Sequence, residues 1–361
     1  MQKQSVPALQ DLAKKVNQLQ GLLKVLKPIP PFFAVPTTSG TGSETTVAAV
    51  ITDSATHHKA SINDTVLIPK YAVLDPKLTV GLPQFVTATT GMDALCHAVE
   101  AYTNHTYLTK LEKKLALEAI RLIYNNLLVA YNDGKNIEAR QNMQKAAFYA
   151  GRAFTRGCVG YVHAVGHTLG GLYGVPHGLA MSVILPHVMR QFGSAVYDKL
   201  ADCADVCGIE GADNKEKAIK FIEWIEDMKR QMNLPAGIAD IKEKDIPQII
   251  KWASKEANPL YPVPVIWGEA DFRKLINTLR TAKLEQIMNC PYCNNEMKKG
   301  VIDAKSRPIW TTRNKATLFK RKDELALCNW DATEYSAAYY CENCGKIIID
   351  LNETVSYLDI D

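Results

Sequence analysis

The sequence predicts a chain of three parts: an α/β segment over residues 1–82, an all-helical domain over residues 83–283, and a small β domain over residues 284–361. Three observations indicate this division. The first part contains short apolar runs bounded by Gly, Pro, Ser and Thr, which is typical of strands and loops. The second part repeats apolar residues at helical spacing over long stretches. The third part holds two Cys-x2-Cys pairs among strand-like runs.

The composition is that of a globular protein. Of the 361 residues, 47% are hydrophobic and 22% are charged, which excludes a disordered chain. The net charge of +4 is too small to indicate a nucleic-acid or membrane partner, and no apolar run reaches the roughly 18 residues of a membrane span. The first residues lack a signal-peptide core, and the nine cysteines are unevenly placed, so we expect a cytoplasmic protein without a disulfide framework.

The α/β segment is predicted to begin with a helix over residues 8–26 and to continue with a short buried strand, Phe32–Val35. This strand runs into the Gly-, Ser- and Thr-rich loop Pro36–Glu44. Because open α/β sheets bind ligands at the carboxyl ends of their strands, the loop is a candidate ligand site, although most loops of this kind are simple turns. Further strands are predicted at Thr46–Asp53, Lys59–Ile62 and Tyr71–Pro76, the first two as a hairpin.

The second part is predicted to consist of helices. One helix contains Thr90–Glu100 and another contains Gly160–Gly171, and both are rich in small and apolar residues. The remaining predicted helices span Leu108–Tyr131, Ile137–Phe154, Met181–Phe192, Ala195–Cys207, Lys215–Met232, Asp245–Ala257 and Glu269–Thr281. This domain carries every candidate metal ligand except the C-terminal cysteines.

Five side chains of the helical domain form a candidate metal site. Asp93 and His97 are four residues apart, so on a helix they project from the same side and can bind one divalent cation. Alone, such residues are more often a hydrogen-bonded pair. His163 and His167 repeat the spacing in an apolar helix, and His177 follows at a Pro-His-Gly turn. Histidines in apolar surroundings are costly unless a partner satisfies them, so this group favours a ligand set.

These motifs resemble those of a known family. The pattern Asp-x3-His-Ala-x-Glu, His-x3-His and Pro-His-Gly is similar to the metal site of the iron-containing (group III) alcohol dehydrogenases, and the resemblance extends over residues 24–280. It implies that the α/β segment is a remnant of a nucleotide-binding domain and that the helical domain is a dehydrogenase domain with a dehydroquinate synthase-like fold. It also implies Fe²⁺ or Zn²⁺ bound by Asp93, His97, His163 and His177, with His167 as a catalytic residue that passes a proton or contacts the substrate.

The resemblance further implies NAD(P)-dependent interconversion of a small alcohol and an aldehyde. A divalent cation lowers the pKa of an alcohol, and the nicotinamide accepts the hydride. The loop after the first strand would then contact the nicotinamide half of the cofactor. The candidate cofactor-binding residues are Thr37, Thr38, Thr41, Gly42, Ser43 and Lys59, the last being equally interpretable as a solvated surface lysine. A homodimer is a possible assembly.

The N-terminal segment departs from the family pattern. Family members carry a Gly-Gly-Gly-Ser loop at a helix N-terminus that binds the cofactor pyrophosphate, whereas Gly21 is the only glycine in residues 1–27. We therefore expect impaired dinucleotide binding, and a strand at Phe32–Val35 without a parallel partner in its own chain. The alternatives are a non-catalytic metal-binding remnant with a zinc-ribbon interaction module, and an incomplete or misjoined reading frame.

The C-terminal part is predicted to be a zinc ribbon. Cys290 and Cys293 form one Cys-x2-Cys turn, and Cys341 and Cys344 form a second. Such turns direct backbone N–H groups toward thiolates that bind a structural Zn²⁺. The segment resembles small bacterial zinc-ribbon domains of unassigned function, and its slight net acidity argues against DNA binding.

Overall fold

The computed structural model divides into two compact units, residues 1–284 and residues 285–361, and each is described by itself. The structure describes residues 16–19, 21–25, 29–52, 59–105, 107–238, 240–281, 298–300, 309–310, 325–326, 334–341 and 346–356. The division of the first unit into an α/β segment and a helical domain at residue 82 stays a prediction.

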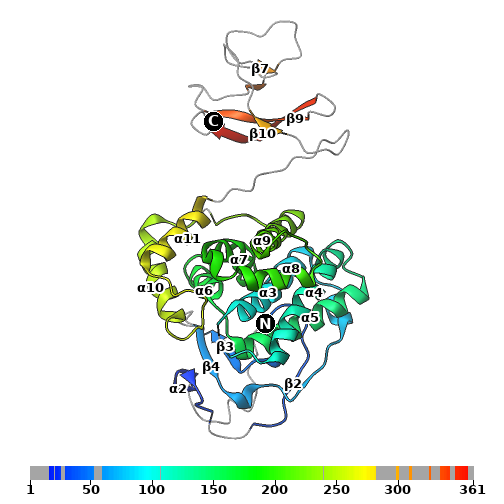
Figure 1. Ribbon diagram of the computed structural model, residues 1–361, viewed down its shortest axis with the longest axis vertical. Helices are drawn as coiled ribbons and strands as arrows, with labels where there is room; N and C mark the ends of the chain where they lie inside the picture. The colour runs from blue at the N-terminus through cyan, green and yellow to red at the C-terminus, as the bar shows by residue number, and fades with distance from the viewer. Residues whose placement is uncertain are drawn as a thin grey trace. The chain divides into compact units, whose positions relative to one another are not determined.

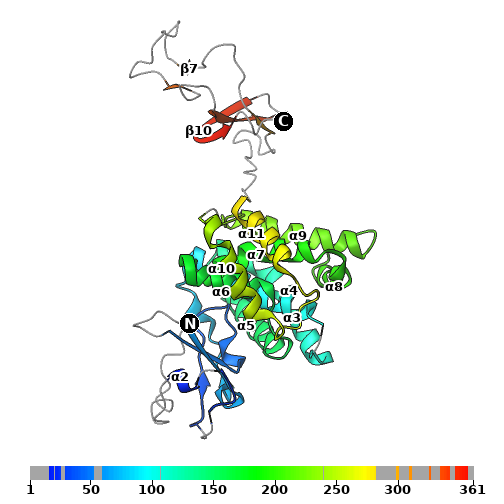
Figure 2. The ribbon, with the colours of Figure 1, turned by 90° about the vertical axis from the view of Figure 1, so that its left-hand side faces the viewer.

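The first unit begins with short strands that lie at one end of its helices (Figures 1 and 2). One sheet has the order β1-β4-β3, with β1 at Gly21–Leu22, β3 at Ala48–Thr52 and β4 at Lys59–Asn63. The antiparallel pairing of β3 with β4 confirms the predicted hairpin. Because β1 pairs in parallel with β4, it has a partner from a later part of the chain.

The predicted helix over residues 8–26 is wrong at its C-terminal end. Within the described residues, helix α2 covers only Val16–Leu19, and the chain then becomes strand β1. Gly21 has a φ of 110°, a backbone conformation that interrupts a right-handed helix and that glycine adopts readily. Its neighbours continue the apolar helical spacing, so periodicity alone could not place this break.

The prediction for Phe32–Val35 is wrong in two respects. Strand β2, Phe33–Ala34, pairs in parallel with β5, Tyr71–Ala72, so it does have a parallel partner in its own chain. It is also not a buried strand, because Phe33 is 56% exposed and its ring stacks on that of Tyr71 at the surface, with centroids 4.6 Å apart. A cross-strand aromatic pair of this kind stabilises the sheet without full burial.

Nine α-helices follow among the described residues, and they confirm the predicted helical pattern. Their bounds are α3 Gln84–Thr103, α4 Lys110–Asn132, α5 Ile137–Gly157, α6 Tyr161–Tyr173, α7 His177–Phe192, α8 Tyr197–Val206, α9 Asn214–Gln231, α10 Ile246–Ala257 and α11 Glu269–Thr281. Short 3₁₀ turns are η1 Ser43–Thr45, η2 Thr65–Leu67, η3 Pro76–Thr79, η4 Gly193–Ala195 and η5 Glu243–Asp245. None of the described helices is both long enough and apolar enough to cross a membrane.

Helix α3 is the centre of the first unit (Figure 1). From Thr87 to Thr103 every residue except Thr90 is buried, and α4, α5 and α7 pack around it. A helix that is apolar or small on all sides is stable only when other elements cover it. The residues that α3 carries are therefore held in a rigid interior.

Glycines allow the close approaches around α3. A Cβ on Gly178, in the first turn of α7, would lie 2.4 Å from the carbonyl oxygen of Thr89 on α3. A Cβ on Gly160, just before α6, would lie 2.8 Å from a carboxylate oxygen of Glu100. Real Cβ atoms do not come this close to oxygen, so only glycine lets α6 and α7 begin against α3.

The second unit contains short strands. Strands β6 (Lys298–Gly300), β9 (Glu334–Cys341) and β10 (Lys346–Ser356) form an antiparallel sheet in the order β10-β9-β6. Strands β7 (Ile309–Trp310) and β8 (Leu325–Ala326) form a separate pair. Cys341 is the last residue of β9, whereas Cys290, Cys293 and Cys344 lie outside the described residues, so the zinc ribbon stays a prediction.

Candidate metal centre

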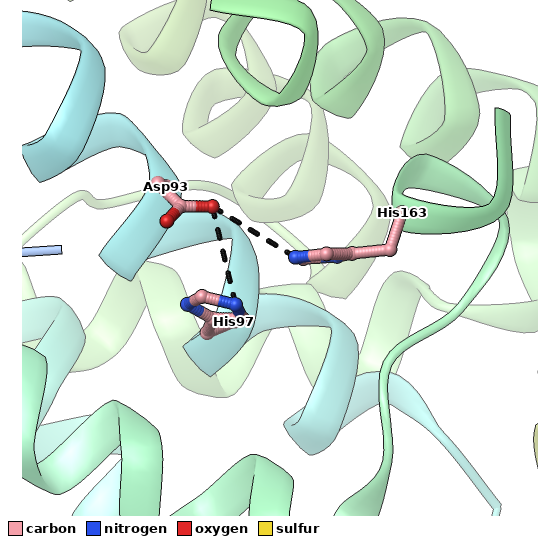
Figure 3. A group of neighbouring side chains, drawn as sticks. All are labelled: Asp93, His97 and His163. Atoms are coloured by element: carbon pink, nitrogen blue, oxygen red, sulfur yellow. Dashed lines mark ion pairs between the residues drawn. The ribbon is translucent and has the colours of Figure 1, made fainter. Parts of the chain in front are cut away.

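Three helices bring four of the predicted ligands to one point. Helix α3 carries Asp93 and His97, α6 carries His163, and α7 begins at His177. The Nε2 atoms of His97, His163 and His177 lie 3.9, 3.8 and 3.3 Å from the same oxygen, Oδ1 of Asp93. Figure 3 shows this oxygen directed at both His97 and His163.

Local structure explains how the four side chains meet. Asp93 and His97 are separated by one turn of α3, so they share a face. His163 lies in the first turn of α6, and its ring stacks on that of His97 with centroids 4.6 Å apart. Pro176 caps α7 and the small Gly178 brings its first turn against α3, which places His177 at the open side, where it is 39% exposed.

The donor atoms fit a bound cation better than they fit one another. Oδ1 of Asp93 and Nε2 of His163 are buried and make no well-formed hydrogen bond within the described part of the chain, and Nδ1 of His97 is buried without one too. The 3.3 Å contact of His177 with Asp93 is short enough for a hydrogen bond but is not aligned as one. Unsatisfied buried polar atoms are costly. Metal bonds of about 2.1 Å place neighbouring donors about 3.0–3.4 Å apart, close to the spacing here.

The electrostatics keep these donors in the form that binds a metal. Burial would raise the pKa of Asp93, but the imidazoles of His97 and His177 outweigh it and the pKa is lowered. Burial lowers the pKa of His97, although Asp93 opposes this, and it lowers the pKa of His163 well below its usual value. At neutral pH Asp93 is therefore a carboxylate and the imidazoles of His97 and His163 are neutral, which are the ligand forms.

Glu100 is a functional residue that sequence reasoning left without a role. Its Oε2 lies 2.5 Å from Nδ1 of His163, and its Oε1 accepts the backbone N–H of Val162 at 2.8 Å. A carboxylate that accepts from one imidazole nitrogen leaves the other nitrogen, here Nε2, free to bind a metal. Burial raises the pKa of Glu100 to about 8, against the opposing effect of backbone N–H groups. In the metal-free protein at neutral pH the group therefore holds a proton that it shares with Nδ1 of His163, and a cation on Nε2 favours the carboxylate form. Its position two turns after Asp93 on the same helix was the available signal.

His167 lies beside the ligand group and outside it. Its ring stacks on that of His177, with centroids 5.2 Å apart and planes 18° from parallel. Its Nδ1 lies 2.7 Å from Oε1 of Glu256, and its side chain is 44% exposed. The arrangement suits a group that exchanges protons with solvent or contacts a substrate at the open side of the site.

The predicted cofactor loop packs against the helices that form the centre. A Cβ on Gly40 would lie 2.7 Å from the carbonyl oxygen of Thr90 on α3, so the loop touches the helix just before Asp93. The buried amide of Gln144 on α5 donates to the carbonyl oxygens of Pro36 and Asp75, which follow β2 and β5. The carboxyl ends of both strands are thereby tied to the helical domain.

The loop residues themselves differ in exposure. Thr37 is exposed, and Thr38, Thr41 and Ser43 are half-buried, so all four can contact a ligand. Gly42 is buried in a left-handed conformation with φ 56°, and a Cβ on it would meet Gly151 of α5 at 2.7 Å. Packing therefore already explains this glycine. Lys59 is the first residue of β4. The cofactor contacts of these residues stay predictions.

The fold and this donor set define a helical protein with a candidate metal centre. Residues 87–278 match the C-terminal part of the Fe-containing alcohol dehydrogenase family, and residues 8–76 match the iron-containing alcohol dehydrogenase family. The chain therefore belongs to the iron-containing alcohol dehydrogenase family. Residues 290–353 match a domain of unknown function, DUF6487.

Curated relatives and solved structures agree with this assignment. The chain is 41% identical over 245 residues to a 1,3-propanediol dehydrogenase of Klebsiella pneumoniae, covering 67% of this chain and 63% of that protein. It is 39% identical over 246 residues to an NAD-dependent methanol dehydrogenase of Bacillus methanolicus, covering 67% and 64%. A crystal structure of a 1,3-propanediol oxidoreductase superposes with a TM-score of 0.69 and 38% identity, over 73% of this chain and 69% of that one. The chain thus spans less than two thirds of the length of these curated relatives.

Proposed function

We propose that this protein is a metal-dependent alcohol dehydrogenase that transfers hydride between a small alcohol or aldehyde and NAD(P). The metal, Fe²⁺ or Zn²⁺, is held by Asp93, His97, His163 and His177. The observation that carries the proposal is the convergence of three imidazole Nε2 atoms within 3.9 Å of one buried carboxylate oxygen. The names of the relatives, a propanediol and a methanol dehydrogenase, support a small alcohol as the substrate.

Each residue has a separate task in this proposal. The bound cation supplies the Lewis acidity that lowers the pKa of an alcohol hydroxyl. Glu100 keeps the proton of His163 on Nδ1, so that Nε2 stays a ligand. His167, on the open side, receives the hydroxyl proton or holds the substrate by a hydrogen bond. The two roles of His167 are both consistent with its exposure.

The nicotinamide half of the cofactor is assigned to the loop Pro36–Glu44. Its exposed and half-buried hydroxyls are available, and Gly40 brings the loop against α3 next to the ligand group. A hydride acceptor must lie against the carbon that bears the hydroxyl, so a cofactor site beside the metal site is required. NAD is the cofactor named for the methanol dehydrogenase relative, which supports NAD(P) here.

The test of the proposal is metal content together with turnover. We expect purified protein to hold about two metals per chain, one at this centre and one zinc in the C-terminal unit. His177→Ala should remove one metal and leave the other, because Nε2 of His177 is the donor at 3.3 Å from Asp93. The matched control is His105→Ala, an exposed histidine whose ring contacts the carbonyl of Pro264.

The outcome can contradict the proposal in two ways. An unchanged metal content in His177→Ala would show that the ligand assignment is wrong. A metal-loaded protein that oxidises no small primary alcohol with NAD or NADP would refute the dehydrogenase activity while leaving the metal centre intact.

Metal binding without dehydrogenase turnover is the second candidate function. It is favoured by the N-terminal segment, where Gly21 is the only glycine in residues 1–27, so that segment offers no glycine-rich phosphate loop. In this case the helical domain binds its cation, and the C-terminal unit acts as an interaction module. Titration with NADH separates the two candidates, because only the first requires the chain to bind the dinucleotide.

The proposal for the C-terminal unit is a structural zinc bound by Cys290, Cys293, Cys341 and Cys344. The sheet order β10-β9-β6 supports it. Lys298 at the start of β6 pairs with Tyr340, next to Cys341, so β6, which begins five residues after Cys293 in the sequence, lies beside the end of β9. A zinc ribbon requires two cysteine turns close together.

A further inference from the structure

A glutamate outside the metal centre contacts His167. Glu256 lies in the last turn of α10, and its Oε1 lies 2.7 Å from Nδ1 of His167 on α6. The same oxygen accepts the hydroxyl of Tyr261 at 3.0 Å. One carboxylate oxygen therefore lies within hydrogen-bond distance of two groups, the histidine next to the ligands and the hydroxyl of the segment after α10.

The segment that carries Glu256 is fixed to α6. The hydroxyl of Tyr161, at the start of α6, donates to Oδ1 of Asn258 at 2.9 Å and accepts the backbone N–H of Trp267 at 2.9 Å. The backbone N–H of Tyr261 donates to Ala257 at 2.7 Å. These bonds hold the end of α10 beside α6, the helix that carries His167. The contact between Glu256 and His167 is therefore more firmly fixed than a simple exposed ion pair.

The hydroxyl of Tyr261 is a donor to this carboxylate. Burial, together with the nearby Glu256, raises the pKa of the Tyr261 phenol, so its hydroxyl keeps its proton and donates it. A carboxylate has only acceptor sites when ionised, and the remaining partner of its Oε1, Nδ1 of His167, must then be the N–H donor. The neutral ring is thereby held in the tautomer with the proton on Nδ1 and a lone pair on Nε2.

We propose that Glu256, supported by Tyr261, is the positioning residue for His167: it fixes the Nδ1–H tautomer and the ring orientation over His177, so that Nε2 is the nitrogen that accepts a proton. The inference rests on the proposed dehydrogenase function for its chemical purpose. The stacked contact of His167 with His177, at 5.2 Å between centroids, places this nitrogen's ring at the open side of the metal centre. Glu256 does for His167 what Glu100 does for the ligand His163.

The experiment is NMR of histidine tautomers in the full-length, zinc-loaded protein. Protein with ¹⁵N-labelled histidine is measured at about pH 8.5, where free imidazole is neutral, and the signal of His167 is assigned by its loss in His167→Gln. We expect His167 to be mainly the Nδ1–H tautomer in the unmodified protein. In Glu256→Ala the population should move to the Nε2–H tautomer, and Tyr261→Phe should move it part of the way. Glu256→Gln keeps an acceptor oxygen and should retain the Nδ1–H form.

Activity provides the second readout. With 1,3-propanediol as the substrate, Glu256→Ala should lower kcat by about 10- to 100-fold, with KM and the metal content close to those of the unmodified protein. Glu256→Gln should restore most of the lost turnover. The control is Glu269→Gln, an exposed glutamate on α11 that pairs with Arg273, and it should change neither the tautomer nor kcat.

The two readouts fail separately. An unchanged tautomer in both Glu256→Ala and Tyr261→Phe overturns the inference, whatever the turnover. A tautomer that depends on Glu256 in a protein without alcohol oxidation upholds the positioning role and refutes the proposed dehydrogenase function. If Glu256→Ala does not fold, Glu256→Leu decides, because it keeps the bulk of the side chain and removes both acceptor oxygens from His167.

Discussion

Replacing Glu100 with glutamine is the most informative change at the metal centre, because the two side chains have the same shape but different hydrogen-bonding groups. In the metal-binding form the carboxylate accepts from the N–H of Val162 at 2.8 Å and from Nδ1 of His163 at 2.5 Å, and the thiol of Cys96 lies 3.9 Å from the same oxygen as His163. A glutamine has one acceptor oxygen and one NH₂ donor. If the oxygen takes Val162, the NH₂ group faces Nδ1 of His163, and the imidazole must carry its proton on Nε2.

This change of tautomer sets the magnitude. A protonated Nε2 cannot bind a metal. Metal binding to Glu100→Gln therefore requires the proton of His163 to move back to Nδ1, where it faces the NH₂ group of the glutamine. An unsatisfied buried donor costs about 1–3 kcal/mol, and losing such a partner typically reduces metal affinity about 10- to 100-fold, or about 1.4–2.8 kcal/mol. The two figures agree. The metal-free variant satisfies both neighbours, so its stability should change by less than about 1 kcal/mol.

The assay is a competition titration of Zn²⁺ against a chromophoric chelator, together with urea unfolding of the metal-free protein. We expect a zinc Kd about 10- to 100-fold higher in Glu100→Gln than in the unmodified protein. The control is Glu118→Gln, a half-buried residue of α4 whose carboxylate bonds Arg121. A Kd within about twofold of the unmodified value, or a metal-free variant destabilised as much as the zinc-bound one, would refute the reasoning.

Three further predictions concern other parts of the chain. Cys341→Ser should lower zinc content by one per chain in elemental analysis and leave the metal at Asp93 in place. Burial lowers the pKa of Lys229 to about 8, whereas the unfolded chain keeps that proton to about pH 10.4; the contribution of Lys229 to the free energy of unfolding, measured as the difference from Lys229→Met, should therefore rise by about 3 kcal/mol between these pH values. Lys229→Met should stabilise the protein by a similar amount at pH 7 in urea titrations. NADH should bind the 361-residue chain alone about a thousandfold more weakly than it binds a relative with a glycine-rich loop, since several hydrogen bonds of about 1.5–3 kcal/mol each are lost.

Each of these predictions has an outcome that contradicts it. Unchanged zinc in Cys341→Ser would remove the ribbon assignment. A stability of Lys229→Met that follows the unmodified protein at pH 7 would show that the buried ammonium is not penalised. Micromolar binding of NADH in a fluorescence titration, with ordinary turnover, would show that another segment completes the nucleotide site.

The helices of the first unit could be read from the sequence because their signals are local. Apolar spacing and flanking Gly, Pro, Ser, Thr and Asp residues located α4 to α11, and the small and apolar residues of Thr90–Glu100 indicated part of α3. That other elements cover α3 on all sides is a finding of the structure. Local signals failed at Gly21, where one φ value ends the helical pattern, and at Phe33. The pairing of Phe33 with Tyr71 joins distant segments and leaves no trace in the spacing of either.

Asp93 and His97 can be named as candidate donors from the sequence alone, since they share a face of any helix that contains them. The contacts of His163 and His177 with the same oxygen of Asp93, of Glu100 with His163, and of Glu256 with His167 are visible only in the folded chain. The physical reason is the range of each interaction. An i,i+4 relation follows from the helix repeat alone, whereas a hydrogen bond between α3 and α6, or between α6 and α10, depends on which glycines and apolar faces let those helices pack.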